Sequence, residues 1–366
     1  MKNMKKWVPL FLILCLVAPS VWAAGKHNKQ IARILWDRQL KVGKKNKFFP
    51  EGATPLIDGG RIYIGTNAGI FYCLDRAKGK NIWSFDSGGP VGAGAATDGK
   101  QVFFGNGKGM VTALDAQTGK KVWDAFVGGE ILAEPVLSND DLFVVTTSRE
   151  IYSLDKQTGK EQWSTFIKGF ENKITMRGHA PLALVGNRLY AAFADGQVVS
   201  LSASNGSVGW SEDLSNPDRV FKDIDAGLLL DGADLYAVGY FGTLARLRKD
   251  SGSVVWKKEI SSGVTPSQDD DKIFVTSTDG VVLALRKDTG TRQWETALSS
   301  GLLSAPFLKN GVLLVGAEKN RLYLLDKETG KVLQKIPAGA FIGNAGSDDS
   351  TIYFLTSGGK LTALFI

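Results

Sequence analysis

The sequence feature that most constrains the fold is a motif that returns about every 40 residues. Each copy holds an alternating run, a short turn and then a tryptophan, as in Val111–Trp123 and Ile151–Trp163. The intervals between successive tryptophan places after Trp83 are 40, 40, 47, 46, 38 and 40 residues. A period of this length, with several short strands in each unit, is typical of a β-propeller. The eight places are Trp36, Trp83, Trp123, Trp163, Trp210, Trp256, Trp294 and Gln334, where glutamine stands for tryptophan.

Each unit divides into four strands separated by clusters of Asn, Asp, Gly and Ser. In the third unit the expected strands are 133–137, 142–147, 150–154 and 161–167. The turn between the third and fourth strands reads Asp-x-x-Thr-Gly-Lys in several units. Its Asp can accept backbone N–H groups, and its Gly can adopt a positive φ. We therefore interpret these residues as structural, and we expect the tryptophans to pack between neighbouring blades.

The two ends of the repeat complete one another. The segment Lys360–Ile366 reads as a third strand without a fourth, and Ile34–Leu40 reads as a fourth strand without the first three. Pairing them closes the ring and removes exposed sheet edges. The sequence thus predicts an all-β fold: an eight-bladed β-propeller over residues 31–366, with four-stranded antiparallel blades and the last blade closed by the N-terminal strand.

The N-terminus resembles an export signal. Three lysines precede an apolar stretch, and Ser20–Ala23 provides an A-x-A-like site, so we expect a signal peptide at 1–23, cleaved after Ala23, and a flexible arm at 24–30. Bulky Leu14 precedes Cys15, which argues against a lipid-attachment site. We therefore expect a soluble, unlipidated periplasmic protein with no membrane span.

Composition excludes several classes of chemistry. The formal charge is +7, and removal of the three signal lysines leaves a weakly basic chain. Its positive and negative residues are mixed along the sequence, which does not favour nucleic-acid binding. Only two histidines are present, and Cys73 is the one cysteine after the signal, expected to be a small buried residue. The acidic run 269–271 reads as a solvated turn without calcium-loop spacing. The glycine-rich stretch 105–109 precedes no expected helix, so it reads as a hairpin turn.

Two breaks in the repeat mark a candidate functional region. From the tryptophan place to the aligned second-strand residue the gap is 18 to 20 residues in five units, but 27, 27 and 26 after Trp36, Trp163 and Trp210. The last two give adjacent long loops, 168–179 and 215–226, which strand alternation puts on one face. Apolar and charged side chains together suit a protein contact, and ordinary loops with internal ion pairing are the alternative. The candidate partner-binding residues are Ile174, Met176, Arg177, Asp223 and Asp225.

The repeat frame resembles the PQQ-like propeller superfamily, and the whole chain after the signal resembles its BamB family of outer-membrane protein assembly factors. The stretches 174–181 and 218–225 are similar to that family's apolar-x-apolar-Arg-Gly-x-Ala-Pro and Asp-Arg-x-x-x-Asp-x-Asp stretches. The resemblance implies a scaffold whose two loops dock a POTRA domain of BamA at the inner face of the outer membrane, beside other assembly-complex subunits. Binding of unfolded outer-membrane proteins would also suit a propeller face.

By the same resemblance, Ile174 and Met176 would be apolar anchors and Arg177 the charged anchor. Asp223 and Asp225 would face basic groups or brace Arg177. Family members are usually lipoproteins, and this chain departs from them in lacking a usable lipid-attachment motif. The superfamily also holds quinoprotein dehydrogenases, which use adjacent cysteines and a calcium site. This sequence has no cysteine pair, so no cofactor, no metal and no enzyme activity are expected. A quinoprotein oxidoreductase and a periplasmic propeller that binds peptide or glycan remain the alternatives.

Overall fold

The computed structural model of the chain describes residues 30–43, 53–169, 180–215, 226–240, 242–298, 301–318, 321–341 and 343–366. Residues Ile31–Ile366 form one compact unit. The expected signal peptide and the arm up to residue 29 lie outside the described residues. No helix of the described chain is both long and apolar enough to span a membrane.

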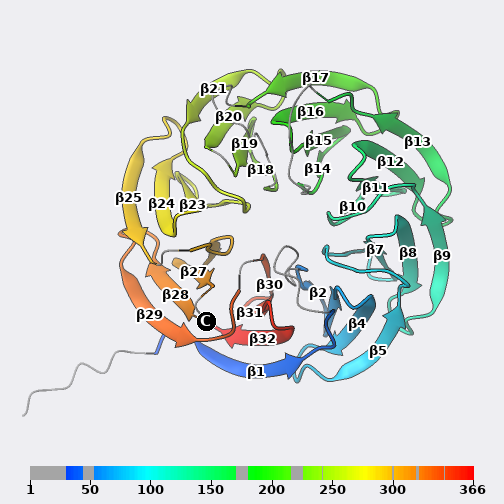
Figure 1. Cartoon of the computed structure of the whole chain (residues 1–366), viewed down its shortest axis with the longest axis horizontal. Coiled ribbons are helices and arrows are strands. Elements are labelled where there is room, and N and C mark those ends of the chain that lie inside the picture. The colour runs from blue at the N-terminus through cyan, green and yellow to red at the C-terminus, as the bar shows by residue number, and fades with distance from the viewer. Residues whose placement is uncertain are drawn as a thin grey trace, which may run out of the picture. The chain divides into compact units, whose positions relative to one another are not determined.

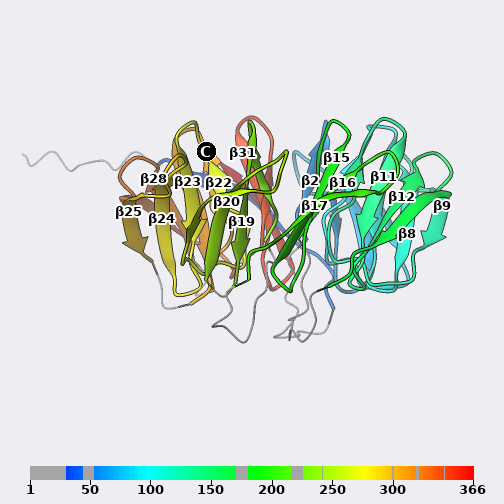
Figure 2. The ribbon, with the colours of Figure 1, turned by 90° about the horizontal axis from the view of Figure 1, so that it is seen from above.

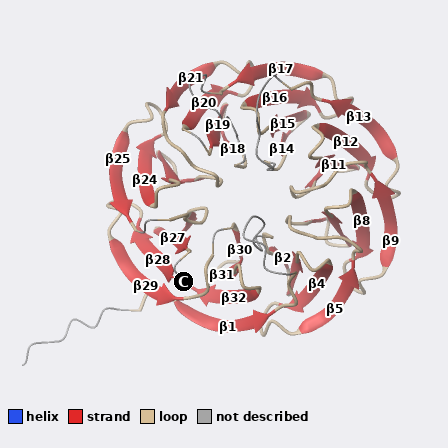
Figure 3. Cartoon of the chain, in the orientation of Figure 1, coloured by secondary structure: helices blue, strands red, loops and turns tan. Residues whose placement is uncertain are grey.

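Eight four-stranded antiparallel sheets stand around a central axis as the blades of a propeller, which confirms the predicted fold class (Figure 1). The described residues contain no helix (Figure 3). In each blade the first strand lies nearest the axis and the fourth strand forms the outer wall.

The first four blades follow the chain in order. Their strands are β2 (Leu56–Asp58), β3 (Arg61–Gly65), β4 (Ile70–Asp75) and β5 (Asn81–Asp86) in blade 1; β6 (Ala96–Thr97), β7 (Gln101–Gly105), β8 (Met110–Asp115) and β9 (Lys121–Phe126) in blade 2; β10 (Val136–Leu137), β11 (Asp141–Val145), β12 (Glu150–Asp155) and β13 (Glu161–Phe166) in blade 3; β14 (Ala183–Val185), β15 (Arg188–Ala192), β16 (Gln197–Ser202) and β17 (Val208–Asp213) in blade 4.

The last four blades continue the order, except that the outer strand of blade 8 is the first strand of the chain. Their strands are β18 (Leu229–Asp231), β19 (Asp234–Gly239), β20 (Thr243–Arg248) and β21 (Val254–Lys258) in blade 5; β22 (Ser267–Gln268), β23 (Lys272–Thr276), β24 (Val281–Arg286) and β25 (Arg292–Ala297) in blade 6; β26 (Phe307–Lys309), β27 (Val312–Ala317), β28 (Arg321–Asp326) and β29 (Val332–Pro337) in blade 7; β30 (Ala345–Ser347), β31 (Thr351–Leu355), β32 (Lys360–Phe365) and β1 (Arg33–Gln39) in blade 8.

The strands of the third unit fall where the sequence predicts them, with one correction. The first strand was expected from residue 133, but β10 begins at Val136. Pro135 precedes it and has no N–H to donate to a ladder, so the segment 133–135 runs toward the axis unpaired in the sheet.

The hydrophobic core is a series of clusters between neighbouring sheets. One cluster joins Phe143 and Ile151 of blade 3 to Leu189, Phe193 and Val199 of blade 4, all of them buried. Another joins the last blade to the first, so the series continues across the chain ends. Each blade therefore buries its apolar faces only against its two neighbours, as in other repeat folds.

Each tryptophan lies between its own blade and the next, as predicted. The Trp83 ring is 5.9 Å from the Tyr63 ring of its own blade, measured between centroids. On its other side lies Gly119 of the next blade, whose φ is +71° and whose added Cβ would sit 2.6 Å from Trp83 Cδ2. The Trp83 Nε1–H donates to the carbonyl of Ala116 at 3.2 Å. All seven tryptophans of the repeat make the same bond into the next blade, with acceptors Arg76, Ala116, Lys156, Ala203, Lys249, Lys287 and Lys327.

The predicted closure of the ring by the chain ends is confirmed. Strand β1 pairs antiparallel with β32, from Arg33 opposite Phe365 to Gln39 opposite Lys360. Gln334 takes the tryptophan place in blade 7, and its side chain binds the backbone that leads into β1. Its Oε1 accepts from the N–H groups of Ile31 at 2.8 Å and Ala32 at 3.0 Å, and its Nε2 donates to the Ala32 carbonyl at 2.9 Å.

Three smaller predictions can be compared with the structure. Cys73 is buried and unpaired, and burial raises the pKa of its thiol to about 11. The stretch 105–109 is a turn between β7 and β8, as expected. The interpretation of 269–271 as a solvated turn is wrong for Asp269, whose carboxylate is largely buried and pairs with Lys327 of the next blade at 2.8 Å. This pair joins blades 6 and 7. Among the described residues, no group of three or more His, Cys, Asp or Glu is placed to hold a metal.

Candidate functional site

The fourth strands all end, and the first strands all begin, on the same side of the ring, which we call the loop face. The antiparallel order within each blade requires this, and the side view of the ring shows it (Figure 2). The turns between second and third strands lie on the loop face too, and the Asp-x-x-Thr-Gly turns lie on the opposite face.

The five predicted partner-binding residues lie outside the described residues. Ile174, Met176 and Arg177 fall in 170–179, and Asp223 and Asp225 fall in 216–225. The described ends of both segments are on the loop face. Gly169 follows blade 3, Ala180 and Ser215 bracket blade 4, and Ala226 precedes blade 5. The predicted placement of the two segments on one face, on either side of one blade, therefore holds for their described ends.

An arginine-centred network lies at the base of the first segment. Arg149, in the turn between β11 and β12, pairs with Asp195 of blade 4 at 3.1 Å, and both side chains are mostly buried. Its Nε donates to the Ile167 carbonyl at 2.9 Å, and its Nη2 donates to Gln197. The guanidinium also lies over the Phe193 ring, 4.2 Å from the centroid. One side chain thus joins the end of β13 to the next blade where the segment begins.

Arg149 has a backbone conformation that normally requires glycine. Its φ is +67°, and the equivalent turns of six other blades hold glycine at positive φ, as at Gly109 and Gly196. A left-handed conformation costs an L-residue about 1–2 kcal/mol. A side chain kept at this cost indicates that its contacts matter at this position.

Two large aromatic side chains are exposed at the loop-face end of the outer wall. Phe126 ends β9 and Phe166 ends β13, and they are 69% and 63% exposed. The same place is held by Asp86 in blade 1 and Asp213 in blade 4. Neighbouring exposed aromatics at the rim of a face favour contact with another macromolecule.

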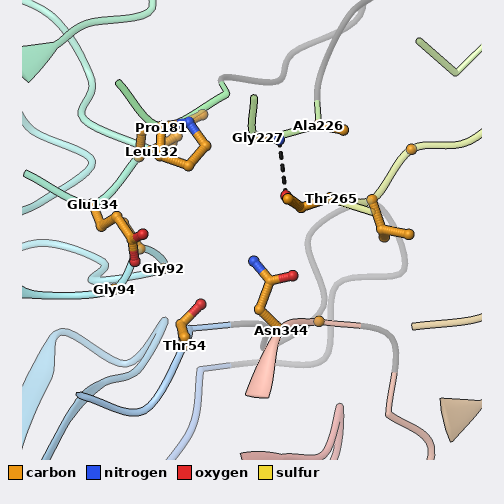
Figure 4. A pocket seen from close by; sticks show the side chains of 15 residues that line it. Thr54, Gly92, Gly94, Leu132, Glu134, Pro181, Ala226, Gly227, Thr265 and Asn344 are labelled. Atoms are coloured by element: carbon orange, nitrogen blue, oxygen red, sulfur yellow. Dashed lines mark hydrogen bonds between the residues drawn. The ribbon is translucent and has the colours of Figure 1, made fainter. Parts of the chain in front are cut away.

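A cavity of about 220 Å³ lies at the loop-face end of the central channel. It is lined mainly by the segments that lead into the first strands, including Gly94, Glu134, Pro181, Gly227 and Asn344 (Figure 4). Pro181 and Ala226 belong to the lining and lie within two residues of the two long segments. The cavity and the candidate docking loops therefore share one face.

Glu134 is the one ionisable residue in the described lining of this cavity. Burial raises the pKa of its carboxyl group above the ordinary glutamate value. The sequence interpretation singled out neither Glu134 nor Arg149. Both could have been identified from the sequence, because each is a charged residue at a repeat position where most other units have a small or neutral residue.

The comparisons with known proteins agree on the fold. Residues 23–92, 67–296 and 241–366 match the family model described as outer membrane protein assembly factor BamB. No curated protein sequence matches the chain significantly. The solved structure of BamB from Moraxella catarrhalis is 21% identical, with a TM-score of 0.81 over 92% of this chain and 100% of that one.

Enzymes share the architecture at lower identity. The quinohemoprotein alcohol dehydrogenase of Comamonas testosteroni is 14% identical, with a TM-score of 0.77 over 92% of this chain and 77% of that one. A computationally designed protein, Ika8, is 15% identical with a TM-score of 0.70, over 90% of this chain and 98% of that one. At such identities the solved structures establish a shared fold and nothing finer.

Proposed function

The chain belongs to the family of the outer membrane protein assembly factor BamB, and on that premise we propose that it is a non-enzymatic periplasmic scaffold. In this role it docks on a POTRA domain of BamA, beside other subunits of the assembly complex, and assists insertion of outer-membrane proteins. It reaches the inner face of the outer membrane through that partner. The observation that carries the proposal is the family match, which extends over the whole ring and both long segments.

The docking surface in this proposal is the loop face around blade 4. Ile174 and Met176 supply apolar contact, Arg177 supplies the charged anchor, and Asp223 and Asp225 face basic groups of the partner or brace Arg177. Fully desolvated arginine and apolar anchors are the usual hot spots of protein interfaces. The exposed Phe126 and Phe166 extend the same face outward.

The Arg149 network supports this proposal by fixing the base of the first segment. It ties Ile167, two residues before Gly169, to Asp195 and Gln197 of blade 4. A loop held at its root loses less conformational freedom when it binds, and pre-organisation of this kind raises affinity. We therefore assign Arg149 a positioning role in docking.

A quinone-dependent oxidoreductase is the function to weigh against the scaffold. Cys15 and Cys73 are the sequence's two cysteines, so it has no adjacent pair. No tryptophan lines the described cavity. We expect the purified protein to carry no quinone. A stoichiometric quinone absorbance would overturn the non-enzymatic assignment.

The test is direct binding of the purified chain to the purified POTRA region of BamA from the same organism, measured by calorimetry. Arg177→Ala should weaken binding by ~2 kcal/mol or more, the cost typical of a hot-spot truncation. Arg292→Ala is the matched control, because Arg292 lies on the outer strand β25 near the opposite face and is well exposed. Equal affinities of a folded Arg177→Ala protein and the control would remove the residue-level proposal, and absence of any binding would remove the partner.

A further inference from the structure

One position of the repeat forms a ring of residues around the central channel. It lies two residues before the first-strand residue that pairs with a large second-strand side chain, which is aromatic in seven blades and Leu314 in blade 7. Glu134, for example, lies two residues before Val136, which pairs with Phe143. The register of the eight blades places Thr54, Gly94, Glu134, Pro181, Gly227, Thr265, Ala305 and Asn344 at this axial position. Seven of the eight line the cavity, and Glu134 is the only charged residue among them.

The neighbouring blade leaves space for the Glu134 carboxylate. A Cβ added to Gly94 would lie 2.4 Å from Glu134 Oε2, closer than any real contact, although Gly94 has no positive φ. An alanine here would therefore displace the carboxylate, which is the end of a flexible side chain, from its present position. The carboxylate rests against the Gly94 backbone, and in Figure 4 Thr54 and Asn344 lie below it in the view and extend into the same cavity.

The half-buried Glu134 carboxylate has no hydrogen-bond or ion-pair partner among the described residues, in contrast to the buried carboxylates of Asp195 and Asp234. Asp195 pairs with Arg149, and Asp234 pairs with both Arg246 and Arg248. Partial burial disfavours the charged form of a carboxylate, and this burial raises the pKa of Glu134. A cation placed beside it would recover the lost stabilisation, which favours an ion-binding role over a structural one.

We infer that the cavity at the loop-face end of the channel binds an ammonium or guanidinium group, with the Glu134 carboxylate as its counter-ion. Thr54 and Asn344 offer side-chain oxygens to the remaining N–H donors of such a group. The volume of about 220 Å³ exceeds the space of a single water several-fold. A metal ion is less suited, because no cluster of three or more potential ligand side chains occurs in the described chain.

The cation can come from a free amine or from a lysine or arginine side chain of a bound polypeptide. Both present the same chemistry to Glu134, and the channel mouth faces the side of the ring that carries the long segments. This inference does not depend on docking to BamA, since Glu134 lines the channel and does not lie on the outer rim.

The experiment titrates the full folded chain with n-butylammonium and n-butylguanidinium at low ionic strength and follows binding by saturation-transfer NMR. n-Butanol is the neutral probe of matched shape. Glu134→Gln should weaken binding of both cations about tenfold or more, since it removes the charge of a charge-assisted pair. Glu161→Gln is the matched control, because it removes one carboxylate from the exposed outer strand of the same blade and should leave binding unchanged.

A second variant keeps the charge and moves it. Gly94→Ala brings a methyl group against Glu134 Oε2, so it should weaken cation binding while the net charge stays the same. Short peptides with one lysine are compared with the same peptides that carry norleucine in its place. This comparison shows whether the bound cation comes from a polypeptide or from a free amine. Selective binding of the lysine peptide assigns the site to a polypeptide, and binding of the free amines alone assigns it to small amines. Absence of binding, binding of n-butanol as strong as that of the cations, or equal affinities of wild type and Glu134→Gln would overturn the inference.

Discussion

Replacing Gln334 should open the closure of the ring, because its side chain is what binds the N-terminal segment at the last tryptophan place. The seven tryptophans donate to a carbonyl of the next blade and pack on a glycine of the turn between its third and fourth strands, as Trp294 does on Gly330. Blade 8 has no such turn, because its third strand β32 pairs with β1, which precedes blade 1 in the sequence. Gln334 instead makes three hydrogen bonds with the backbone of Ile31 and Ala32.

Gln334→Leu removes all three bonds and leaves two N–H groups and one carbonyl without that partner. At roughly 1 kcal/mol net for each bond, the loss is about 3 kcal/mol. We expect this loss to make local opening of β1 easier. Hydrogen exchange of the 33–39 amides should therefore accelerate about 100-fold, since each ~1.4 kcal/mol corresponds to a factor of ten. Gln334→Glu keeps the acceptor and loses the donor, and should give a smaller effect. Leu333→Ala is the control, because Leu333 is its neighbour on β29 and 37% exposed. Exchange in Gln334→Leu equal to that of Leu333→Ala would refute the reasoning.

Three further predictions concern stability. Gly159→Ala should lower the free energy of urea unfolding by about 3 kcal/mol, because φ is +73° and the new Cβ would lie 2.5 Å from Trp123 Cε3. Gly186→Ala has a φ of +56° and open space around the new Cβ, so it should cost only about 1 kcal/mol, and equal costs would contradict the packing argument. Glu134→Gln should raise the melting temperature at pH 7, because the raised pKa of Glu134 means that the folded state favours the protonated carboxyl group. The gain in melting temperature should vanish as pH falls toward ~4, where the carboxyl group is protonated in the unfolded chain as well. A gain that does not depend on pH would exclude the Glu134 charge as its cause. The hydroxyl and N–H of Thr158 donate to Asp155 and lower the pKa of its carboxyl group. The stabilisation of the folded state by these bonds is therefore present above the ordinary aspartate pKa of ~3.9 and is lost as pH falls through the lowered value. Thr158→Val should shift acid unfolding to higher pH, and an unchanged midpoint of acid unfolding would contradict this prediction.

The fold was predictable because the repeat encodes it locally. Within each unit the turn between the third and fourth strands stands at a fixed spacing from the tryptophan place, and the blade packs on its neighbours through those same residues. The terminal half-repeats also predicted the pairing of β1 with β32. The role of Gln334 was not predictable, because its partners lie 303 and 302 residues away in the sequence and only the closed ring brings them together.

The site was predictable only in part. The lengths of the two loops predicted the loop face, because strand alternation fixes the side on which each connection leaves. The Arg149 network depends on contacts between blades, and the channel cavity depends on where seven separate segments converge. Glu134 could have been found by aligning the axial position across the units. Its lack of a partner, however, is a property of three-dimensional packing that no spacing reveals.

The central claim is that the loop face around blade 4 docks on BamA, and site-specific photocrosslinking in the envelope tests it most directly. A photoreactive residue at Lys168, exposed at the root of the first long segment, should give an adduct with BamA. The same residue at Gln117, exposed in a turn of the opposite face, should give none. An adduct from Gln117 alone, or no BamA adduct from Lys168 in a protein that is folded and exported, would contradict the account.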